Sequence, residues 1–496
     1  MDVHGYVIEM AERARTAACE LARLTAGEKN AALVAMADAL VAHRGEIAEA
    51  NAADVVHARE AGLSPAMVDR LTLTDARFAA MVAGVRRVAE LPDPVGDVLW
   101  TRKQPSGITI SKVRVPLGVI AVVFESRPNV FVDTAALCLK TGNAVILRGG
   151  KEAIETNRAL AKAVSGVFFS RDRNVASPLL AQRDRNVASP LLAQRDRNVA
   201  SPLIAQRDRN VASPLLAQRD RNVASPLLAQ RDRNDVSTLD CATKGDATFL
   251  SRREENLSSA VQLVDILDHS AVTELVRAVG LVDVAIPRGG ERLIRAMCEA
   301  ALVPVLKHYK GVCHIYVDDR ADLGMALSIL DNAKTQRPGV CNAAECLLIH
   351  EKLAPLFLPM VRAWAGDKGV TLHFPEDHGR DASVASEWER EFLSLEMNVG
   401  LVADHRAAAR HINRYGSHHS DCIVTNDAER AAEFLRDVDS AAVYHNVSTR
   451  FTDGAEFGMG AEIGISTDKL HARGPMGLEE LTTYKYVVTG DGIVRK

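Results

Sequence analysis

One segment, ITISKVRVPLGVIAVVFE at residues 108–125, changes its hydrophobic pattern halfway along its length. Its first half alternates apolar and polar residues, as a half-exposed strand does, whereas its second half, VIAVVF, is uniformly apolar. Strands that are apolar on both faces are typical of parallel sheets covered by helices. Further apolar strands are expected at 144–150, 260–265 and 282–290, separated by helical stretches. This alternation predicts a doubly wound α/β domain.

A second alternation of strand and helix patterns follows. It begins near VPVLKHYKG at 303–311 and continues through CHIYVDD, CLLIH and DCIVTND, which predicts a second α/β domain. Residues 5–92 show helical spacing of apolar side chains, and we expect helices there. The last segment, TTYKYVVTGDGIVRK, is interpreted as a hairpin that turns at Gly-Asp-Gly.

A tandem repeat interrupts the first alternation. RDRNVASPLLAQ occurs five times from Arg171 to Gln230, with Ile204 in place of leucine in one copy, and a partial copy, RDRN, follows at 231–234. Stacked solenoids usually need units of roughly 20 residues or more, and a shorter unit hardly repays its ordering entropy. We therefore interpret residues 167–256 as an inserted surface segment of frayed helices or disorder. A peptide-binding scaffold is the functional alternative.

Composition excludes several classes of function. The 496 residues carry a net charge of −4, which gives no electrostatic case for a nucleic-acid partner or an anionic membrane. No apolar run approaches the roughly 18 residues of a membrane span. Eight cysteines without paired short spacings indicate a reducing, cytoplasmic location. No closed four-ligand set appears, even around HHSDC at 418–422, so no metal site is expected.

The segment TQRPGVCNAAE, residues 335–345, singles out Cys341. Pro338 and Gly339 end the preceding element, and Asn342 to Glu345 are residues that can begin a helix. Cys341 is therefore expected on a turn before a helix N-terminus, where the helix dipole favours the thiolate. The alternative is a buried cysteine that packs as a small hydrophobic residue.

Two predicted strands end in the same signature, LRGG at 147–150 and PRGG at 287–290. Glycines after a parallel strand let the backbone approach a ligand closely, and a helix N-terminus binds phosphate. Arg148 and Lys151 add positive charge beside the first pair. The pattern suggests a nucleotide site, although glycines of ordinary tight turns are the alternative.

Two other segments offer hydrogen-bond donors. Asn129 in FESRPNVFVD lies just beyond a predicted buried strand, where its amide can donate to an oxyanion or can simply cap a helix. Ser448, Thr449 and Arg450 in NVSTRFTDG are all donors. They can hold an anion, or they can belong to a solvated connection.

These motifs together resemble the γ-glutamyl phosphate reductases of the aldehyde dehydrogenase superfamily. The segments that carry the resemblance are ESRPNV, GNAVILRGGKEA, DNAKTQRPGVCNAAE, HSDCIVTND and STRFTDGAEFGMGAEIGISTDKLHARGPMGLEELTTYK. They occur in order from the N-terminal helices to near the C-terminus, and only the repeat falls outside the match. The long C-terminal motif is very specific.

The resemblance implies a fold and a reaction. The implied fold is α/β and aldehyde dehydrogenase-like, with two doubly wound domains and a small β oligomerisation arm. A cofactor domain is expected at 1–104 and 118–285, a catalytic domain at 286–440, and the arm with C-terminal substrate loops at 105–117 and 441–496. The implied reaction is the NADPH-dependent reduction of L-γ-glutamyl 5-phosphate to L-glutamate 5-semialdehyde with release of phosphate, the second step of proline biosynthesis from glutamate.

The resemblance also implies roles for single residues. Cys341 is the nucleophile that forms a thioacyl intermediate, and Asn129 belongs to the oxyanion hole. The cofactor contacts are Arg148 and Lys151 at the adenosine ribose and its 2′-phosphate, Gly289 and Gly290 at the pyrophosphate, and Glu396 at the nicotinamide ribose.

The substrate carries negative charge at its phosphate and its α-carboxylate. Arg337, Ser448, Thr449 and Arg450 are the candidates for binding these two ends. The resemblance further implies a homo-oligomer and transfer of the substrate from glutamate 5-kinase.

Two other functions remain open. In aldehyde-oxidising members of the superfamily, a glutamate activates water, but the comparable stretch KHYKGV has His308 and no carboxylate. This difference favours reduction over an NAD(P)-dependent oxidation of a free aldehyde. An inactive, repeat-bearing scaffold is the second alternative.

Overall fold

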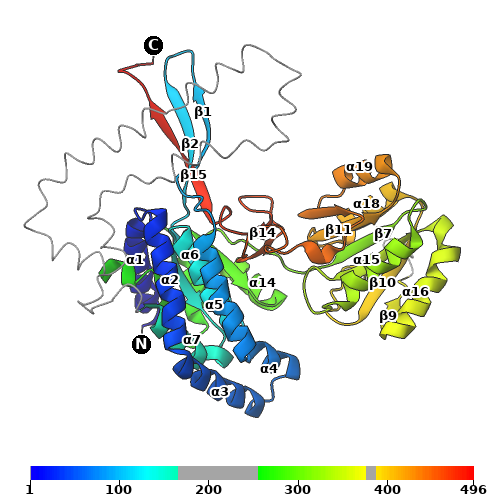
Figure 1. Cartoon of the computed structure of the whole chain (residues 1–496), viewed down its shortest axis with the longest axis horizontal. Coiled ribbons are helices and arrows are strands. Elements are labelled where there is room, and N and C mark those ends of the chain that lie inside the picture. The colour runs from blue at the N-terminus through cyan, green and yellow to red at the C-terminus, as the bar shows by residue number, and fades with distance from the viewer. Residues whose placement is uncertain (1, 166–254, 376–386, 496) are drawn as a thin grey trace, which may run out of the picture. The chain divides into compact units, whose positions relative to one another are not determined.

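A computed structural model describes residues 2–165, 255–375 and 387–495 (Figure 1). Except for residue 255, these residues belong to one unit of the chain, and the second unit spans 170–255. The tandem repeat at 171–234 therefore lies outside the described residues, and its predicted state stays a prediction.

Five helices open the chain, as the apolar spacing over residues 5–92 predicts. They are α1 (Val3–Leu21), α2 (Ala26–Ala42), α3 (Arg44–Glu60), α4 (Pro65–Leu71) and α5 (Asp75–Glu90). Side-chain hydrogen bonds at the N-cap fix where several of these helices begin. Thr25 and Glu28 form a capping box before α2, and the side chains of Ser64 and Thr74 accept hydrogen bonds at the starts of α4 and α5.

The first sheet contains four parallel strands in the order β5-β4-β3-β6. Their bounds are β3 (Val119–Phe124), β4 (Ala144–Arg148), β5 (Val261–Leu263) and β6 (Val284–Arg288). The predicted strands are thus confirmed. The chain moves from β3 to one edge of the sheet and then returns to the other side of β3 to form β6. The carboxyl ends of β3 and β6 therefore frame a topological switch point, where open α/β sheets bind ligands.

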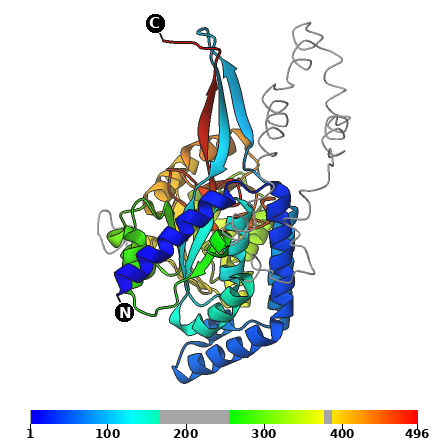
Figure 2. The ribbon, with the colours of Figure 1, turned by 90° about the vertical axis from the view of Figure 1, so that its left-hand side faces the viewer.

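Helices cover both faces of this sheet, which confirms the doubly wound prediction (Figure 2). On one face α6 (Pro128–Lys140) contacts β3 and β4, and α7 (Ile154–Ser165) contacts β5. Helices α2 and α5 pack against this layer. On the other face α1 contacts β3, β4 and β5 and packs against α13 (Ser270–Arg277), while α14 (Glu291–Ala300) contacts β6. Strand β3 is buried along its whole length as a result.

The second sheet has six parallel strands in the order β12-β11-β7-β8-β10-β9. Their bounds are β7 (Cys313–Val317), β8 (Ala344–His350), β9 (Thr371–His373), β10 (Glu396–Val402), β11 (Ser420–Val424) and β12 (Ala442–His445). Helices α15 (Leu323–Thr335) and α16 (Ala354–Lys368) form one layer, and α18 (His405–Tyr415) and α19 (Ala428–Asp437) form the other. Alternate residues of β7 enter different cores, since Ile315 and Val317 join one cluster and Tyr316 the other.

A three-stranded antiparallel arm completes the architecture. It contains β1 (Val98–Lys103), β2 (Thr109–Pro116) and β15 (Thr482–Thr489), with β2 in the middle. Figures 1 and 2 both show these strands as a long ribbon. A smaller antiparallel pair, β13 (Gly464–Ser466) and β14 (Gly474–Met476), lies in the C-terminal segment. Within the described ranges, no helix combines the length and apolar character of a membrane span.

Two expected elements are corrected by the structure. The prediction of a C-terminal hairpin is wrong, because β15 pairs with β2 along its whole length and residues 493–495 form no strand. The expectation of a strand near 303–311 is also wrong. That segment makes only an isolated bridge between Val305 and Ala285, and the Lys307 backbone bonds to Thr467 and Asp468 instead.

The expected domain boundaries also differ from the sheet pairing. Residue 286 falls inside β6, so the first sheet continues to Arg288. Strand β1, expected in the cofactor domain, belongs to the arm. Strand β12, expected with the C-terminal loops, belongs to the second sheet.

Candidate active site

Cys341 lies in the turn between α15 and β8, and not before a helix. The expected helix at 342–345 is wrong, because the chain enters β8 at Ala344. Every residue of β8 is buried between two neighbouring strands, and this packing outweighs the helix propensity of Ala-Ala-Glu. A helix dipole therefore cannot explain thiolate formation at Cys341.

The Cys341 side chain is half-buried. Its turn packs closely on residue 311, where any Cβ would collide with the Cys341 backbone, so only glycine fits. The Cys341 carbonyl also accepts a 3.2 Å hydrogen bond from the Cys313 thiol. Burial raises the pKa of Cys341 to about 11, although the positive charge of Arg288 opposes the increase. Additional positive charge is needed to form the thiolate near neutral pH.

Five arginines supply positive charge around this thiol. We call Arg70, Arg127, Arg288, Arg337 and Arg450 the arginine cluster. Burial, together with the charges of Arg70, Arg288 and Arg337, lowers the pKa of Arg127 to about 10, whereas the charge of Cys341 opposes the decrease. Burial and the charge of Arg337 likewise lower the pKa of Arg450. Like charges at this proximity are unfavourable, and a bound anion would relieve the repulsion.

The cluster is built from separate elements. Arg288 ends β6 and Arg127 immediately precedes α6, so both lie at the carboxyl ends of the strands that form the switch point. Within the described part of the chain, the guanidinium groups of Arg127, Arg288 and Arg337 have no hydrogen-bond or ion-pair partner. Their donors are therefore available to a ligand. Arg127 and Arg288 stand inside ESRPNV and PRGG, but the sequence reasoning above did not select them.

Two partly buried carboxyl groups also act on Cys341. Glu391 accepts a 2.8 Å hydrogen bond from the Gly311 N–H, and Glu462 accepts one of 2.8 Å from Gly454. Burial raises the pKa of both groups, that of Glu462 to about 7 with Arg288 opposing. Both carboxylates raise the pKa of Cys341. Sequence reasoning missed them, although Glu462 lies in the quoted GAEIGIST motif.

Two histidines lie beside the thiol. The rings of His308 and His419 meet edge to face, with centroids 5.5 Å apart. His308 shares a 2.7 Å hydrogen bond between its Nδ1 and the Ile465 carbonyl, and burial lowers its pKa. His419 is buried, and burial together with the His308 charge lowers its pKa to about 3. Both imidazoles are therefore neutral near pH 7.

The predicted substrate loop reaches the turn that carries Cys341. Thr449 is buried and donates a 2.7 Å hydrogen bond to the Asn342 carbonyl, while Ser448 caps the short helix η5 (Thr449–Phe451). Arg450 donates to the Asn342 and Gln336 side chains. The structure thus brings Arg337 and Arg450 together near Cys341, whereas the Ser448 and Thr449 hydroxyls hold the loop itself.

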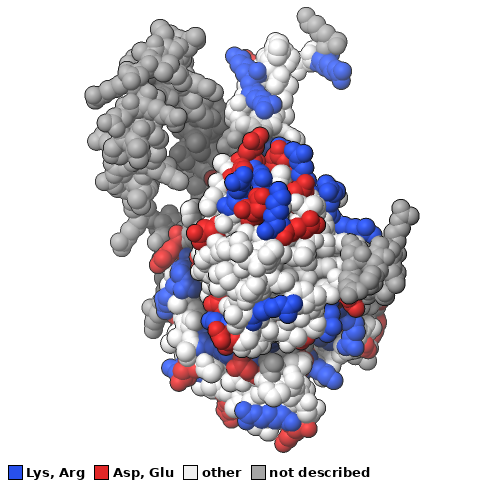
Figure 3. Space-filling model, turned by 90° about the vertical axis from the view of Figure 1, so that its right-hand side faces the viewer, with Lys and Arg blue, Asp and Glu red and all other residues white. Residues whose placement is uncertain are grey.

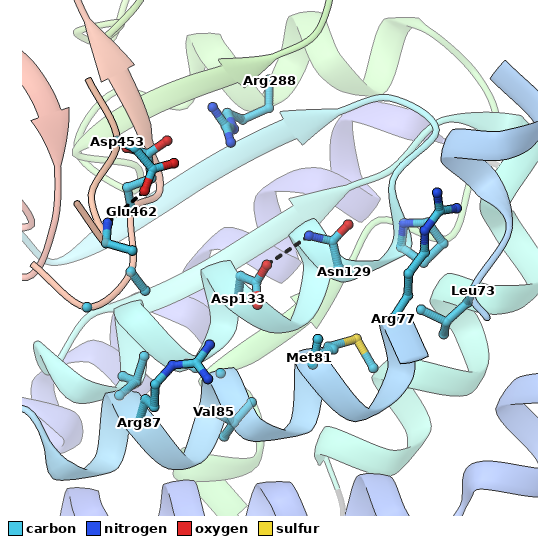
Figure 4. Close-up of a pocket in the computed structure, with 18 of the residues that line it drawn as sticks. Leu73, Arg77, Met81, Val85, Arg87, Asn129, Asp133, Arg288, Asp453 and Glu462 are labelled. Carbon is cyan, nitrogen blue, oxygen red and sulfur yellow. Dashed lines mark hydrogen bonds between the residues drawn. The ribbon is translucent and has the colours of Figure 1, made fainter. Parts of the chain in front are cut away.

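A cavity of about 450 Å³ opens beside this cluster, between α5, α6 and the C-terminal loop (Figure 4). Figure 4 shows Arg77 and Arg87 on α5, with Arg288, Asp453 and Glu462 across the cavity. Its charged and amide lining residues are Arg70, Arg77, Arg87, Asn129, Asp133, Arg288, Asp453 and Glu462. Asn129 is therefore at the cavity, with its amide donating a 2.9 Å hydrogen bond to Asp133.

The second glycine turn lies at the switch point. Gly290 precedes α14, its N–H donates a 3.1 Å hydrogen bond to Glu125, and a Cβ there would meet no atom within 4 Å. A Cβ at Gly289 would instead lie 2.7 Å from the Glu125 side chain. Open space before a helix N-terminus fits the phosphate of a dinucleotide cofactor.

The other predicted cofactor residues differ in burial and in hydrogen-bond partners. Arg148 is buried and donates to the carbonyls of Gly149 (2.8 Å) and Leu267 (3.3 Å), whereas Lys151 is exposed at the start of η1 (Lys151–Ala153). Glu396 begins β10 in the second sheet and shares hydrogen bonds with His373 and Ser394. Lys151 can thus meet a cofactor directly, while the Arg148 guanidinium already has protein partners.

Comparison with known proteins adds independent information. No family model matches the chain. The chain is 44% identical to a γ-glutamyl phosphate reductase of Moorella thermoacetica, with 100% of both chains covered. It is 43% identical to one of Desulforamulus reducens, with 99% of both covered.

Solved structures agree with these relatives. The crystal structure of γ-glutamyl phosphate reductase from Thermotoga maritima matches with a TM-score of 0.78 and 36% identity, over 99% of this chain and 100% of that one. An acetylating aldehyde dehydrogenase from Geobacillus thermoglucosidasius shares the fold, with a TM-score of 0.58 at 13% identity. The identity and coverage of the curated relatives show that the chain belongs to the γ-glutamyl phosphate reductase family, on an aldehyde dehydrogenase-like fold.

Proposed function

We propose that the chain reduces L-γ-glutamyl 5-phosphate to L-glutamate 5-semialdehyde with NADPH and releases phosphate, as the second step of proline biosynthesis. The observation that carries the proposal is the arginine cluster around a half-buried cysteine. The substrate carries an anionic phosphate and an anionic α-carboxylate, and guanidinium groups are well suited to bind both.

The cluster prepares the nucleophile and holds the substrate. Arg288 stabilises the Cys341 thiolate, and the unpartnered guanidinium groups bind the substrate anions next to it. His308 is assigned as the group that takes the thiol proton. Its Nδ1 is held by the Ile465 carbonyl, which leaves Nε2 for the transfer.

The thiolate then attacks the acyl carbon, which the mixed anhydride bond to phosphate already activates. The Cys341 backbone N–H and the Asn129 amide are assigned to the developing oxyanion. Asn129 donates one N–H of its amide to Asp133 and keeps a second N–H for this role. Phosphate leaves into the arginine cluster, and the substrate remains as a thioester on Cys341. The arginines therefore act both on binding and on the leaving group.

A reductase of this family implies a nicotinamide cofactor, and we assign NADPH to the switch point of the first sheet. Gly290 and the N-terminus of α14 would bind its pyrophosphate, and Lys151 would face its 2′-phosphate, with Arg148 supporting that turn. When bound, NADPH supplies the hydride that converts the thioester into an aldehyde. The role of Glu396 at the nicotinamide ribose stays a prediction.

The reverse reaction gives a clean test. Glutamate semialdehyde in its cyclic form, phosphate and NADP⁺ are supplied, and NADPH formation is followed for wild type, Cys341→Ala and the exposed-cysteine control Cys19→Ala. We expect phosphate-dependent turnover that is lost only in Cys341→Ala. Equal turnover without phosphate would instead support an aldehyde-oxidising enzyme, and no turnover with either would support a scaffold.

Partners and location are part of the same proposal. The arm exposes β1 and β15 as its two edges, which suits pairing with a second copy in a homo-oligomer. On the face in Figure 3 basic and acidic side chains are intermingled, which favours a small-molecule partner over a nucleic acid. The seven described cysteines are free thiols, as the cytoplasm would keep them. Transfer of the labile acyl phosphate from glutamate 5-kinase remains a proposal.

A further inference from the structure

We propose that Cys341, His308 and His419 form a binding site for a thiophilic divalent cation such as Zn²⁺, and that the bound ion inhibits the enzyme reversibly. One ligand atom from each of these residues lies within 4.8 Å of the other two. A tetrahedral zinc ion needs such atoms roughly 3.5 Å apart, given Zn–S and Zn–N distances of about 2.3 and 2.0 Å. Small side-chain rotations would therefore close the site.

An unpartnered nitrogen points independently to a ligand. His419 is 0% exposed, and its Nε2 has no hydrogen-bond partner in the described structure. Its Nδ1 lies 2.8 Å from the Ser420 hydroxyl, so Nε2 is the nitrogen left for a cation. A buried nitrogen without a partner is costly, and coordination of a metal ion would remove that cost.

The surrounding hydrogen bonds orient both imidazoles as metal-binding histidines usually are. The Nδ1 of His308 lies 2.7 Å from the Ile465 carbonyl, which leaves its Nε2 for the ion. Behind His419, the hydroxyl of Ser420 contacts that of Thr452 at 2.6 Å, and Thr452 contacts the Tyr444 hydroxyl at 2.7 Å. Such outer partners fix the ring orientation and strengthen metal ligands.

Because Cys341 is one of the three ligands, metal binding is expected to inhibit the enzyme. Two histidines and one cysteine leave a fourth position for water, as in open zinc sites. Binding forms a sulfur–metal bond, breaks the S–H bond of Cys341 and releases one proton to solvent. Inhibition rests on the proposed function, since the sulfur would then be unavailable for acyl transfer. Metal binding itself does not depend on that function.

The test uses the full-length protein, treated with a chelator and then titrated with Co²⁺ alone. We expect one Co²⁺ per chain, with a thiolate-to-cobalt absorption band that Zn²⁺ removes. Cys341→Ser should abolish the band, and His419→Gln and His308→Gln should each weaken binding by about tenfold or more. The exposed His57→Gln variant is the matched control. Circular dichroism confirms that each variant is folded.

A second trio, His314, Cys346 and the half-buried His411, provides the competing explanation. If the band persists in Cys341→Ser and disappears in Cys346→Ala, the proposal is overturned. Absence of any thiolate band in wild type also overturns it. In parallel, Zn²⁺ should slow alkylation of Cys341 by iodoacetamide without any substrate present. This readout separates failure of the metal site from failure of the proposed reaction.

Discussion

Charged side chains from separate segments of the chain determine the pKa of the Cys341 thiol. Arg288 favours the thiolate, whereas burial, Glu391 and Glu462 oppose it. The opposing groups keep the free thiol largely protonated near pH 7. We therefore expect substrate binding to be coupled to transfer of the thiol proton to His308, the acceptor proposed above.

Replacement of Arg450 tests the substrate contacts. Arg450→Ala removes one guanidinium from the arginine cluster, and a charge-assisted hydrogen bond contributes about 1.5–3 kcal/mol. We expect kcat/KM for phosphate in the reverse reaction to fall by about 10- to 100-fold. Arg436→Ala, at an exposed pair on α19, is the control. Unchanged KM and turnover in Arg450→Ala would show that this residue does not bind substrate.

The raised pKa of Glu462 predicts how the stability of the folded chain depends on pH. Its pKa of about 7 in the folded chain lies above its ordinary value of 4.5, so the folded state binds this proton more tightly than the unfolded state. Stability from this group is present below pH 4.5 and is lost as pH rises to 7. Measured by urea unfolding, Glu462→Gln should gain about 1–3 kcal/mol relative to wild type between pH 4.5 and pH 8.

The control for this titration is Glu456→Gln, which changes an exposed carboxyl group in the same loop. Its difference from wild type should stay constant over the same pH range. A constant difference for Glu462→Gln as well would contradict the assignment of a raised pKa to Glu462.

Sequence reasoning selected Cys341, the proposed nucleophile, but missed several of the residues that surround it. Cys341, Arg337 and Arg450 lie in motifs that the chain reveals directly, and the structure brings them together. Arg127, Glu391 and His419 reach the same site from distant segments, and no spacing rule connects them. The expectation of no metal site stays a prediction. The ligands of the proposed cation site, residues 308, 341 and 419, are separated by 33 and 78 residues, so no sequence spacing reveals them.

Among the elements, buried strands could be predicted and local exceptions could not. Strands β3, β4, β7 and β11 are short and mostly apolar, and a parallel sheet covered by helices on both sides buries both of their faces. The segment after Cys341 has helix-forming residues, but its place between β7 and β10 requires a strand. The local sequence of the C-terminal segment is typical of a hairpin. Its strand β15 instead pairs with β2, which lies more than 350 residues away in the chain.

The start of β8 also holds a buried ion pair that should stabilise the cysteine turn. Lys334 on α15 and Glu345 on β8 are both 0% exposed, with Nζ and Oε2 2.9 Å apart. Glu345 also accepts hydrogen bonds from the backbone of Phe392 and Leu393, next to Glu391. Glu345→Gln leaves the Lys334 charge buried without a counter-charge, and we expect a loss of about 3–5 kcal/mol.

A double-mutant cycle measures this pair. Lys334→Met with Glu345→Gln removes both charges and retains an acceptor for the two backbone amides, so its cost should be smaller than the sum of the single changes by about 1–3 kcal/mol. The exposed pair Lys162 and Glu46 should couple by no more than about 1 kcal/mol. Strict additivity at Lys334 and Glu345 would refute the predicted coupling.

For the whole molecule, the three-stranded arm is the expected site of self-association. Tyr484, Tyr486 and Val488 expose large side chains on alternate positions of its edge strand β15. Tyr486→Asp and Val488→Asp together should dissociate the oligomer into single chains, as measured by sedimentation velocity. Val494→Asp, beyond the end of the strand, is the control. An unchanged molecular mass for both variants would place the interface elsewhere.

Attack of Cys341 on an acyl phosphate held by arginines can be observed by mass spectrometry. The protein is mixed with freshly generated γ-glutamyl phosphate in the absence of nicotinamide cofactor and quenched with acid. We expect one added glutamyl group on the peptide that contains Cys341, lost on addition of NADPH, and none in Cys341→Ala. A glutamyl adduct on another residue, or NADPH-dependent turnover by Cys341→Ala at the wild-type rate, would contradict it.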